Sequence, residues 1–414
     1  MKINNHSLPE NTNNDFQSIT VFSQDPNKLI RELVWEISQK YTKCIFVAGE
    51  TDSPRETFPA NVEYVVAPSY RRENFRLRVI SWLTYTFFAF RKTIILLKKT
   101  DLFLFVSSPP FIGILGYLAY FLGKKPYILI VNDIYPDIAE SFGLIHQNGL
   151  VAKLWRAVNR RTYRHAAYII TLSREMSLKI ENQMGKDVSK ERIRVVPTWV
   201  DTGLIKPINK CDNPFAVQHG LKNKITFMYA GNLGHVADVQ LIPRVAEAFS
   251  DNKELHFVVI GKGKKFEEIK SVLADKGLEN ITILPYQPES VLPLMLAAAD
   301  ISLVSVDFRA LNCSLPSKTY YNMSAGSALL VYCAKGDELE RIIETYQCGV
   351  SFQHEHQLID AIKRFLVDDG FVDRCKINAR LTAETLFEKN ICISMILELF
   401  EKINSKVRGK IKKR

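Results

Sequence analysis

Cysteines are few in this sequence, and none has a neighbour at metal-binding spacing. The seven cysteines are spread singly over 414 residues, and no CxxC pair occurs among them. A scattered, odd-numbered set is typical of a protein from a reducing compartment and gives no ligand set for zinc. We therefore expect neither a disulfide framework nor a metal site.

A long uninterrupted apolar run is also missing. Residues 102–123 carry no charge, but the sequence Ser107-Ser-Pro-Pro110 divides them, which predicts a strand, a turn and a helix. The apolar part of residues 71–99 is about a dozen residues long, whereas a membrane-spanning helix needs about 20. The polar, asparagine-rich residues 1–16 predict a disordered leader without a signal peptide. These features predict a cytoplasmic chain that does not span a membrane.

Positive charge is in excess and unevenly spread. The formal net charge is +11. Residues 1–200 hold 27 lysines and arginines against 18 acidic residues, and residues 402–414 hold seven basic residues and no acidic one. A basic first half and a basic tail favour contact with an anionic surface, either nucleic acid or anionic lipid. Because no nucleic-acid-binding module is recognisable, we favour lipid.

One basic and aromatic segment supports this choice of lipid. Between residues 71 and 99, arginines and lysines flank the apolar, aromatic residues 79–90. Such a composition suits a helix that lies in a membrane interface, although a buried helix with a basic rim is the alternative. The tail 406–414 is either a second anchor or a solvated segment. The expected membrane-facing residues are Arg76, Trp82, Phe87, Arg91 and Lys92.

Short apolar runs alternate with helical patterns in both halves. This alternation predicts an α/β fold with doubly wound parallel sheets. We divide the chain into a leader (1–16), a first domain (17–201), a linker rich in proline and glycine (202–222), a second domain (223–390) and a C-terminal helix with the basic tail (391–414).

Polar residues and glycines follow several predicted strands, at the edge where open α/β sheets bind ligands. Asp133 is the best-placed carboxylate of the first half, either in a site or as a helix cap, and Asp137 is expected to be a cap. In the second half, glycines would let the backbone approach a ligand closely. The residues after these strands are Gly231, Asn232, Gly234, Gly261 and Gly263.

The segment of residues 315–331 contains the strongest candidate for an anion site. Pro316 and Ser317 predict the start of a short helix, and Gly326 predicts its end. A helix N-terminus has unpaired N–H groups that can hold a phosphate, and Lys318 would add a full charge there. An ordinary helix with a solvated lysine is the alternative.

Several segments, in this order, resemble the family 4 glycosyltransferases of the GT-B fold. The resemblance is greatest to the bacterial branch that builds capsule, O-antigen and exopolysaccharide repeat units. The segments cover nearly the whole chain. They are Ser108-Pro-Pro110, Asp133-Ile-Tyr-Pro136, Val196-Pro-Thr-Trp-Val-Asp201, Tyr229-Ala-Gly-Asn-Leu-Gly234, Val259-Ile-Gly-Lys-Gly263, Pro316-Ser-Lys318 and Ser324-Ala-Gly326.

The resemblance implies two Rossmann-like domains that face each other across a cleft, with a nucleotide-sugar bound by the second. It also implies transfer with retention of anomeric configuration, without a metal or other cofactor. Asp133 would lie across the cleft, near the acceptor or the reacting sugar, as the catalytic carboxylate. The implied donor-binding residues are Gly231, Asn232 and Gly234 (Gly231 and Gly234 near the phosphates), Gly261 and Gly263 at the base or ribose, Ser317 and Lys318 at the diphosphate, and also Tyr321 and Glu338.

Three positions depart from the pattern of this family. Tyr321 stands where many members carry a glutamate that is thought to contact the ribose, and a neutral phenol cannot accept two ribose hydroxyls as a carboxylate does. Residues 23–27 (Ser-Gln-Asp-Pro-Asn) replace the glycine-rich loop that usually follows the first strand. Residues 235–238 (His-Val-Ala-Asp) replace the commoner small, glutamine-containing sequence.

We therefore expect a retaining hexosyl- or acetamidosugar-type glycosyltransferase of surface-polysaccharide biosynthesis. Its partners would be a nucleotide-sugar donor, with UDP favoured, a lipid-linked (polyprenyl-diphosphate) sugar acceptor and the anionic membrane surface, but no nucleic acid. It would be attached peripherally to the inner face of the cell membrane. Two alternatives stay open: a nucleotide-sugar epimerase of the same fold, and a decayed transferase that only binds, which Tyr321 motivates.

Overall fold

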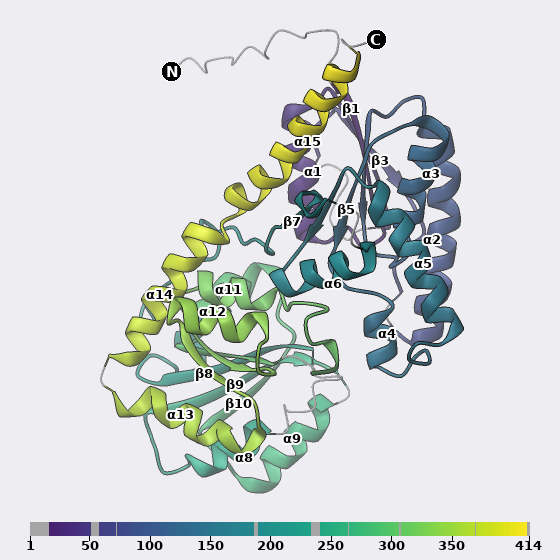
Figure 1. The fold of residues 1–414 in the computed structure, drawn as a ribbon. Coiled ribbons are helices and arrows are strands. Elements are labelled where there is room, and N and C mark those ends of the chain that lie inside the picture. The colour runs from purple at the N-terminus through teal and green to yellow at the C-terminus, as the bar shows by residue number, and fades with distance from the viewer. Residues whose placement is uncertain are drawn as a thin grey trace, which may run out of the picture.

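Two parallel sheets organise the chain, and each forms the centre of its own domain (Figure 1). The computed structural model describes residues 16–50, 58–71, 73–185, 189–232, 241–263, 265–305, 308–368 and 370–411. In both sheets the strand order reverses direction between two central neighbours, which is the doubly wound arrangement. The predicted α/β architecture is therefore confirmed.

The first domain contains a seven-stranded sheet with the order β3-β2-β1-β4-β5-β6-β7. Its inner strands are almost wholly buried, because helices cover both faces of the sheet and leave no solvated side for polar residues. The strands are β1 (Ser18–Ser23), β2 (Lys43–Ala48), β3 (Val62–Val66), β4 (Leu102–Val106), β5 (Tyr127–Val131), β6 (Tyr168–Thr171) and β7 (Ile193–Val195). The helices are α1 (Lys28–Lys40), α2 (Phe75–Leu96), α3 (Gly113–Gly123), α4 (Asp137–Ser141), α5 (Leu150–His165), α6 (Arg174–Met184) and the 3-10 turn η2 (Lys190–Arg192).

The second domain contains a six-stranded sheet with the order β10-β9-β8-β11-β12-β13. The strands are β8 (Ile225–Asn232), β9 (Leu255–Lys262), β10 (Ile281–Pro285), β11 (Ile301–Ser305), β12 (Ala328–Tyr332) and β13 (Gly349–Phe352). The helices are α7 (Pro214–Gln218), α8 (Leu241–Ala248), α9 (Lys265–Lys276), α10 (Leu292–Ala297), α11 (Lys318–Ser324), α12 (Glu338–Tyr346), α13 (Leu358–Val367), α14 (Phe371–Leu386) and α15 (Lys389–Ile411), with 3-10 turns η4 (Glu289–Val291), η5 (Phe308–Ala310) and η6 (Glu355–Gln357).

Residues 202–222, for which the sequence predicts a linker, are packed into the second domain. Ile205, Phe215 and Leu221 are buried in its core. The side chain of Asn213 accepts hydrogen bonds from the first N–H groups of α7 and donates to the Leu294 carbonyl at 2.8 Å. Proline and glycine in this stretch therefore belong to turns of the domain, and the linker prediction was wrong.

The C-terminal helix α15 returns to the first domain. It starts in the second domain and runs along the edge of the molecule to the far end of the first (Figure 1). Ile393, Ile396 and Phe400 are buried against α1 and the first sheet. The two crossings between domains lie side by side: the Val200 N–H donates to the Phe387 carbonyl at 2.9 Å, and the Lys389 N–H donates to the Val200 carbonyl at 3.0 Å. The first domain is thus completed by the last helix of the chain.

Helix α2 contains the segment that the sequence assigns to the membrane. Within the described part of the chain, this one helix, with 22 residues, has the length and composition to cross a membrane. It packs, however, as a cover of the first sheet: Tyr85 and Ala89 are fully buried, and the Tyr85 hydroxyl donates to the Val47 carbonyl at 2.8 Å. The opposite face of α2 exposes apolar side chains, including Phe87, which is 66% exposed.

One of the expected membrane-facing residues points the other way. The Trp82 side chain is buried, with 7% of its surface exposed, and its ring lies edge-on to those of Phe111 and Tyr135 at 6.4 and 6.0 Å. The prediction for Trp82 was therefore wrong, because Trp82 lies one turn before Tyr85 on the buried face of α2. Arg76 and Arg91 are exposed, and Lys92 lies over the Phe88 ring at 5.5 Å.

Candidate active site

A cavity of about 460 Å³ lies between the two domains, and the predicted anion site forms part of its wall. First-domain helix α1 contributes Lys28 and Arg31, while the second domain contributes the remaining lining. That second-domain lining consists of Ala230, Gly231, Ile260, Tyr286, Gln287, Glu289, Leu292, Met295, Leu296, Ser317, Lys318, Tyr321 and Asn322. The volume is in the range of small-molecule sites. The structure thus brings Gly231, Ser317, Lys318 and Tyr321 together, as the sequence predicted.

Lys318 opens helix α11 and points toward the end of strand β8. Its ammonium lies 4.2 Å from the centre of the Tyr229 ring, and a Cβ built on Gly231 would lie 3.6 Å from Lys318 Nζ. Burial lowers the pKa of Lys318 to about 8, and in the described part of the chain no carboxylate offsets this effect. A closely enclosed amine without a counterion is a ready partner for a phosphate.

The helix around Lys318 matches the sequence pattern in outline. Ser317 occupies the N-cap position, but its side chain makes no capping hydrogen bond, so its hydroxyl is exposed toward the cavity. Helix α11 has seven residues, and Gly326 beyond it has a positive φ of 74°. A positive φ favours glycine, which explains the stop before strand β12. The short helix makes Lys318, more than the helix dipole, the main source of positive potential.

Tyr321 lies one turn beyond Lys318 on the same face of α11, and its ring also lines the cavity. Burial, and then the charges of Glu32, Glu289 and Asp201, raise the pKa of Tyr321 to about 12. The phenol is therefore neutral and can donate one hydrogen bond. Tyr321, which stands where many members of the family carry a glutamate, therefore lies in the wall of the cavity.

The glycines after strands β8 and β9 are neighbours in the sheet. Gly231 pairs with Gly261, and Asn232 pairs with Lys262 at the strand ends. The Lys262 ammonium lies 5.0 Å from the Tyr286 ring, at the rim of the cavity. Gly263 has a φ of 143°, which side-chain-bearing residues rarely adopt. Gly234 lies outside the described residues.

Glu338 is not part of this cavity. It begins helix α12 and lines a second cavity, on the far side of α11, together with Arg341 and Tyr320. Its carboxyl group is ion-paired with Arg341 and hydrogen-bonded to Glu175 of α6, across the domain boundary. Burial, then the neighbouring Glu175, raise the pKa of Glu338 to about 7. The sequence placed Glu338 at the donor, whereas the structure places it in a contact between domains.

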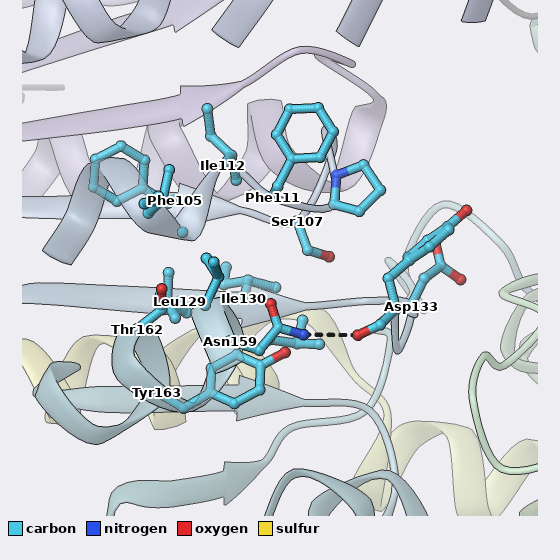
Figure 2. A pocket seen from close by; sticks show the side chains of 16 residues that line it. Phe105, Ser107, Phe111, Ile112, Leu129, Ile130, Asp133, Asn159, Thr162 and Tyr163 are labelled. Carbon is cyan, nitrogen blue, oxygen red and sulfur yellow. Dashed lines mark hydrogen bonds between the residues drawn. The ribbon is translucent and has the colours of Figure 1, made fainter. Parts of the chain in front are cut away.

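Asp133 follows strand β5 and lines a separate small pocket of about 20 Å³, which has room for about one water molecule (Figure 2). Burial raises the pKa of Asp133, and a hydrogen bond from Ser314 of the second domain partly offsets this. Next to it, the Ile134 N–H donates to the Cys313 carbonyl at 3.0 Å. Asp133 is therefore held where the two domains touch.

Neither aspartate of this segment caps a helix. Helix α4 starts at Asp137, its N-cap residue is Pro136, and no side chain caps it. Asp137 instead accepts a hydrogen bond from Gln183 at 3.1 Å and lies 3.8 Å from the Arg156 guanidinium. The cap prediction for Asp137 was wrong. The loop itself is fixed by Asn159, whose Nδ2 donates to the Tyr135 carbonyl at 2.8 Å (dashed line in Figure 2).

Two cations of the site were missed in the sequence. Lys28 and Arg31 lie in the first turn of α1, directly after residues 23–27, and Asn27 caps this helix. The Arg31 guanidinium donates to the Pro26 carbonyl at 2.8 Å. The signal was available, because a helix that follows the first strand starts at the ligand-binding edge of the sheet. Three basic side chains, from both domains, thus line one cavity.

No group of three or more histidine, cysteine, aspartate or glutamate side chains suited to a metal ion occurs among the described residues.

Two family models match the chain, one in each domain. The model described as "Glycosyltransferase Family 4" matches residues 27–204, and the model described as "Glycosyl transferases group 1" matches residues 213–382. The chain is also 26% identical over 233 residues to a probable glycosyltransferase, WbjE, of Pseudomonas aeruginosa. That match covers 56% of this chain and 57% of WbjE, so it spans little more than half of the relative.

Solved structures share the two-domain architecture over nearly the whole chain. Anabaena HepE, solved with UDP and glucose, has a TM-score of 0.66 at 13% identity and covers 93% of this chain and 100% of its own. Sucrose-phosphate synthase from Thermosynechococcus elongatus has a TM-score of 0.72 at 13% identity, covering 94% and 100%. WaaG, a glycosyltransferase involved in lipopolysaccharide biosynthesis, has a TM-score of 0.61 at 14% identity, and the match covers 95% of this chain and 100% of WaaG. At these identities the likeness shows a common fold.

Proposed function

Because this chain belongs to the family 4 glycosyltransferases and has their GT-B fold, we propose that it moves a sugar from a nucleotide-sugar to a lipid-linked saccharide. The observation that carries the proposal is Lys318, an enclosed amine without a counterion, which faces Lys28 and Arg31 across the interdomain cavity. Three cations suit a donor diphosphate, which carries two or more negative charges. Similar proteins solved with UDP make a UDP-sugar the first donor to test.

In the proposed reaction the bond between the anomeric carbon and the diphosphate oxygen breaks, and positive charge develops on the sugar. An acceptor hydroxyl forms the new bond to that carbon, and its proton passes to the departing diphosphate. Lys318, with the N–H groups around Gly231 and Ser317, stabilises the departing diphosphate. These groups can supply that stabilisation without a metal. Asp133, from the other domain, stabilises the oxocarbenium-like sugar, and the configuration at the anomeric carbon is retained.

The proposed acceptor is a polyprenyl-diphosphate-linked sugar at the cytoplasmic face of the cell membrane. Helices α2, α3 and α5 lie side by side on one flank of the first domain (Figure 1). Their outer faces expose large apolar side chains, and basic side chains lie over nearby rings, as Lys124 does over Tyr120 at 5.4 Å and Arg161 over Tyr117 at 5.9 Å. The exposed apolar residues are Ile80, Leu83, Phe87 and Ile95 on α2, Phe121 and Leu122 on α3, and Leu150, Val151 and Leu154 on α5.

This flank has the composition of a surface that inserts shallowly into an anionic bilayer. Apolar side chains would enter the headgroup region, and each well-placed cation would add about 1 kcal/mol. Arg76, Phe87, Arg91 and Lys92 are part of this surface. Peripheral attachment would bring a lipid-borne acceptor to the first domain and to Asp133. A role in surface-polysaccharide biosynthesis follows from such an acceptor.

The test is a transfer assay with the purified full-length protein. Radiolabelled UDP- and GDP-sugars are offered together with a polyprenyl-diphosphate N-acetylhexosamine in anionic mixed micelles. We expect one donor to yield a labelled lipid product that is extracted into organic solvent, with the anomeric configuration of the donor, whether or not EDTA is present. A broad donor panel without product would refute the proposal, and donor conversion in the absence of acceptor would support an epimerase.

A further inference from the structure

The site contains one carboxylate that has no partner in the described part of the chain. Glu289 begins the 3-10 turn η4, directly after the loop that follows strand β10, and its side chain lines the cavity of Lys318 and Tyr321. Glu289 is exposed, and its carboxylate makes no hydrogen bond or ion pair within the described residues. An acceptor-only group that faces a ligand cavity unpaired is suited to bind hydroxyl donors.

Glu289 also faces the position at which the sequence departs from its family. Its charge acts on the Tyr321 phenol, together with those of Glu32 and Asp201. The other two carboxylates are occupied. Glu32 accepts a hydrogen bond from the Trp199 indole at 2.9 Å, and Asp201 is ion-paired with Lys389 at 3.0 Å. Neither Glu32 nor Asp201 lines the cavity, so Glu289 is the carboxylate that a ligand beside Tyr321 would meet.

The cavity offers one kind of group for each part of a nucleotide. Lys318 and Gly231 mark the proposed place of the diphosphate, and Tyr321 lies one helical turn from Lys318. Tyr286, three residues before Glu289 in the chain, also lines the cavity, and its ring is 65% exposed and offers a flat surface for a base. The ribose, which connects base and diphosphate, would therefore lie against Tyr321 and Glu289.

We infer that Glu289 binds the ribose hydroxyls of the donor nucleotide and takes the place of the carboxylate that Tyr321 replaces. The inference rests on the proposed function. The carboxylate accepts hydrogen bonds from the 2′- and 3′-hydroxyls, and the neutral Tyr321 phenol adds a surface for the ribose. Such charge-assisted bonds are stronger than neutral ones. Recognition of a ribonucleotide would therefore depend on Glu289, the first residue of η4.

The test compares nucleotides with and without ribose hydroxyls by isothermal titration calorimetry. UDP is paired with 2′,3′-dideoxy-UDP, and GDP with its dideoxy form, against the full-length protein. The variants are Glu289→Ala and, as a matched control, Glu279→Ala, which alters an exposed carboxylate at the opposite end of β10. We expect the wild-type protein and the control to bind the ribonucleotide about tenfold or more tightly than the dideoxy form.

In Glu289→Ala this preference is expected to fall to about twofold or less, with the affinity for the dideoxy form unchanged. The double variant Glu289→Ala with Tyr321→Glu is expected to regain the preference, because it restores a carboxylate at the family position. A preference that survives in Glu289→Ala would overturn the inference, and so would equal loss of affinity for both nucleotides. If the wild-type protein binds neither UDP nor GDP, the proposed function itself is contradicted. If it binds them but Glu289→Ala keeps the preference for ribose, only the inference about Glu289 is contradicted.

Discussion

Replacing Lys318 by methionine should make the unliganded protein more stable and at the same time abolish donor binding. Methionine fills similar space without the charge. The ordinary pKa of lysine is about 10.4, and burial lowers that of Lys318 to about 8. A shift of this size corresponds to about 3 kcal/mol by which the folded state disfavours the charged amine. At pH 7 this cost is present in full.

The sign of the pH dependence follows from the same shift. Between about pH 8 and 10.4 the unfolded chain binds the lysine proton and the folded chain does not, so the stability of the wild-type protein rises with pH over this window. The stability of Lys318→Met does not rise over this window, because methionine binds no proton. We therefore expect the excess stability of Lys318→Met to be largest at pH 7, at most about 3 kcal/mol, and to vanish near pH 10.4.

Thermal unfolding at pH 7 and pH 10, with and without UDP, measures both effects. Lys318→Met is expected to melt several degrees above the wild-type protein at pH 7 and to lose the UDP-induced increase in Tm. Lys253→Met, at an exposed site of the second domain, is the matched control and should change neither quantity. If Lys318→Met is less stable at pH 7, or keeps the UDP shift, the account of Lys318 as an enclosed cation that awaits a diphosphate is refuted.

Four further predictions concern other parts of the molecule. Asp133→Asn should keep UDP affinity in calorimetry but lose turnover by about 100-fold or more; unchanged turnover would contradict its role. Arg31→Ala should weaken UDP binding while leaving uridine binding unchanged, since we propose that Arg31 meets the diphosphate and not the nucleoside; equal weakening of both would contradict this role. Glu338→Gln should gain Tm relative to wild type as pH rises from 5 to 8, because the wild-type carboxyl, with a pKa of about 7, loses its favourable proton over this range. Phe87→Asp with Arg91→Glu should reduce cosedimentation with anionic vesicles but leave transfer to a detergent-solubilised acceptor unchanged; equal sedimentation of variant and wild type would contradict the membrane surface.

Local patterns were enough to predict most elements. The strand, turn and helix predicted for residues 102–123 are β4 (Leu102–Val106), the segment with Pro109 and Pro110, and α3 (Gly113–Gly123), because proline marks the break between two apolar segments. Gly326 ends α11 with a positive φ as expected. The resemblance to the family implied that Gly231, Ser317, Lys318 and Tyr321 share one site, and all four line the same cavity, with Gly231 at the end of β8 and the other three in or beside α11.

Errors occurred where long-range packing decides. Nothing local distinguishes the buried face of α2 from its exposed face, since both are aromatic, and Trp82 was assigned to the wrong one. Residues 202–222 have loop composition but contribute Phe215 and Leu221 to a core. Glu338 follows β12 as a site residue would, yet it meets Glu175 of the other domain. Lys28 and Arg31 start the helix after the first strand, which marks them as edge residues, but that they face Lys318 depends on how the two domains are placed. Glu289 follows β10 within the second domain and has no distinguishing local pattern.

The return of helix α15 has a consequence for the order in which the chain is made. The first domain leaves the ribosome before the second, but the side chains that complete its core against α1, such as Ile393, Ile396 and Phe400, are made only after the second domain. Until then the part of α1 that α15 covers is exposed, whereas the helix α14 of the second domain is made together with that domain. A fragment that ends near residue 201 would therefore be expected to aggregate, and adding α15 as a separate peptide should rescue it. The core of the first domain can thus be completed only after residues of α15 have been made.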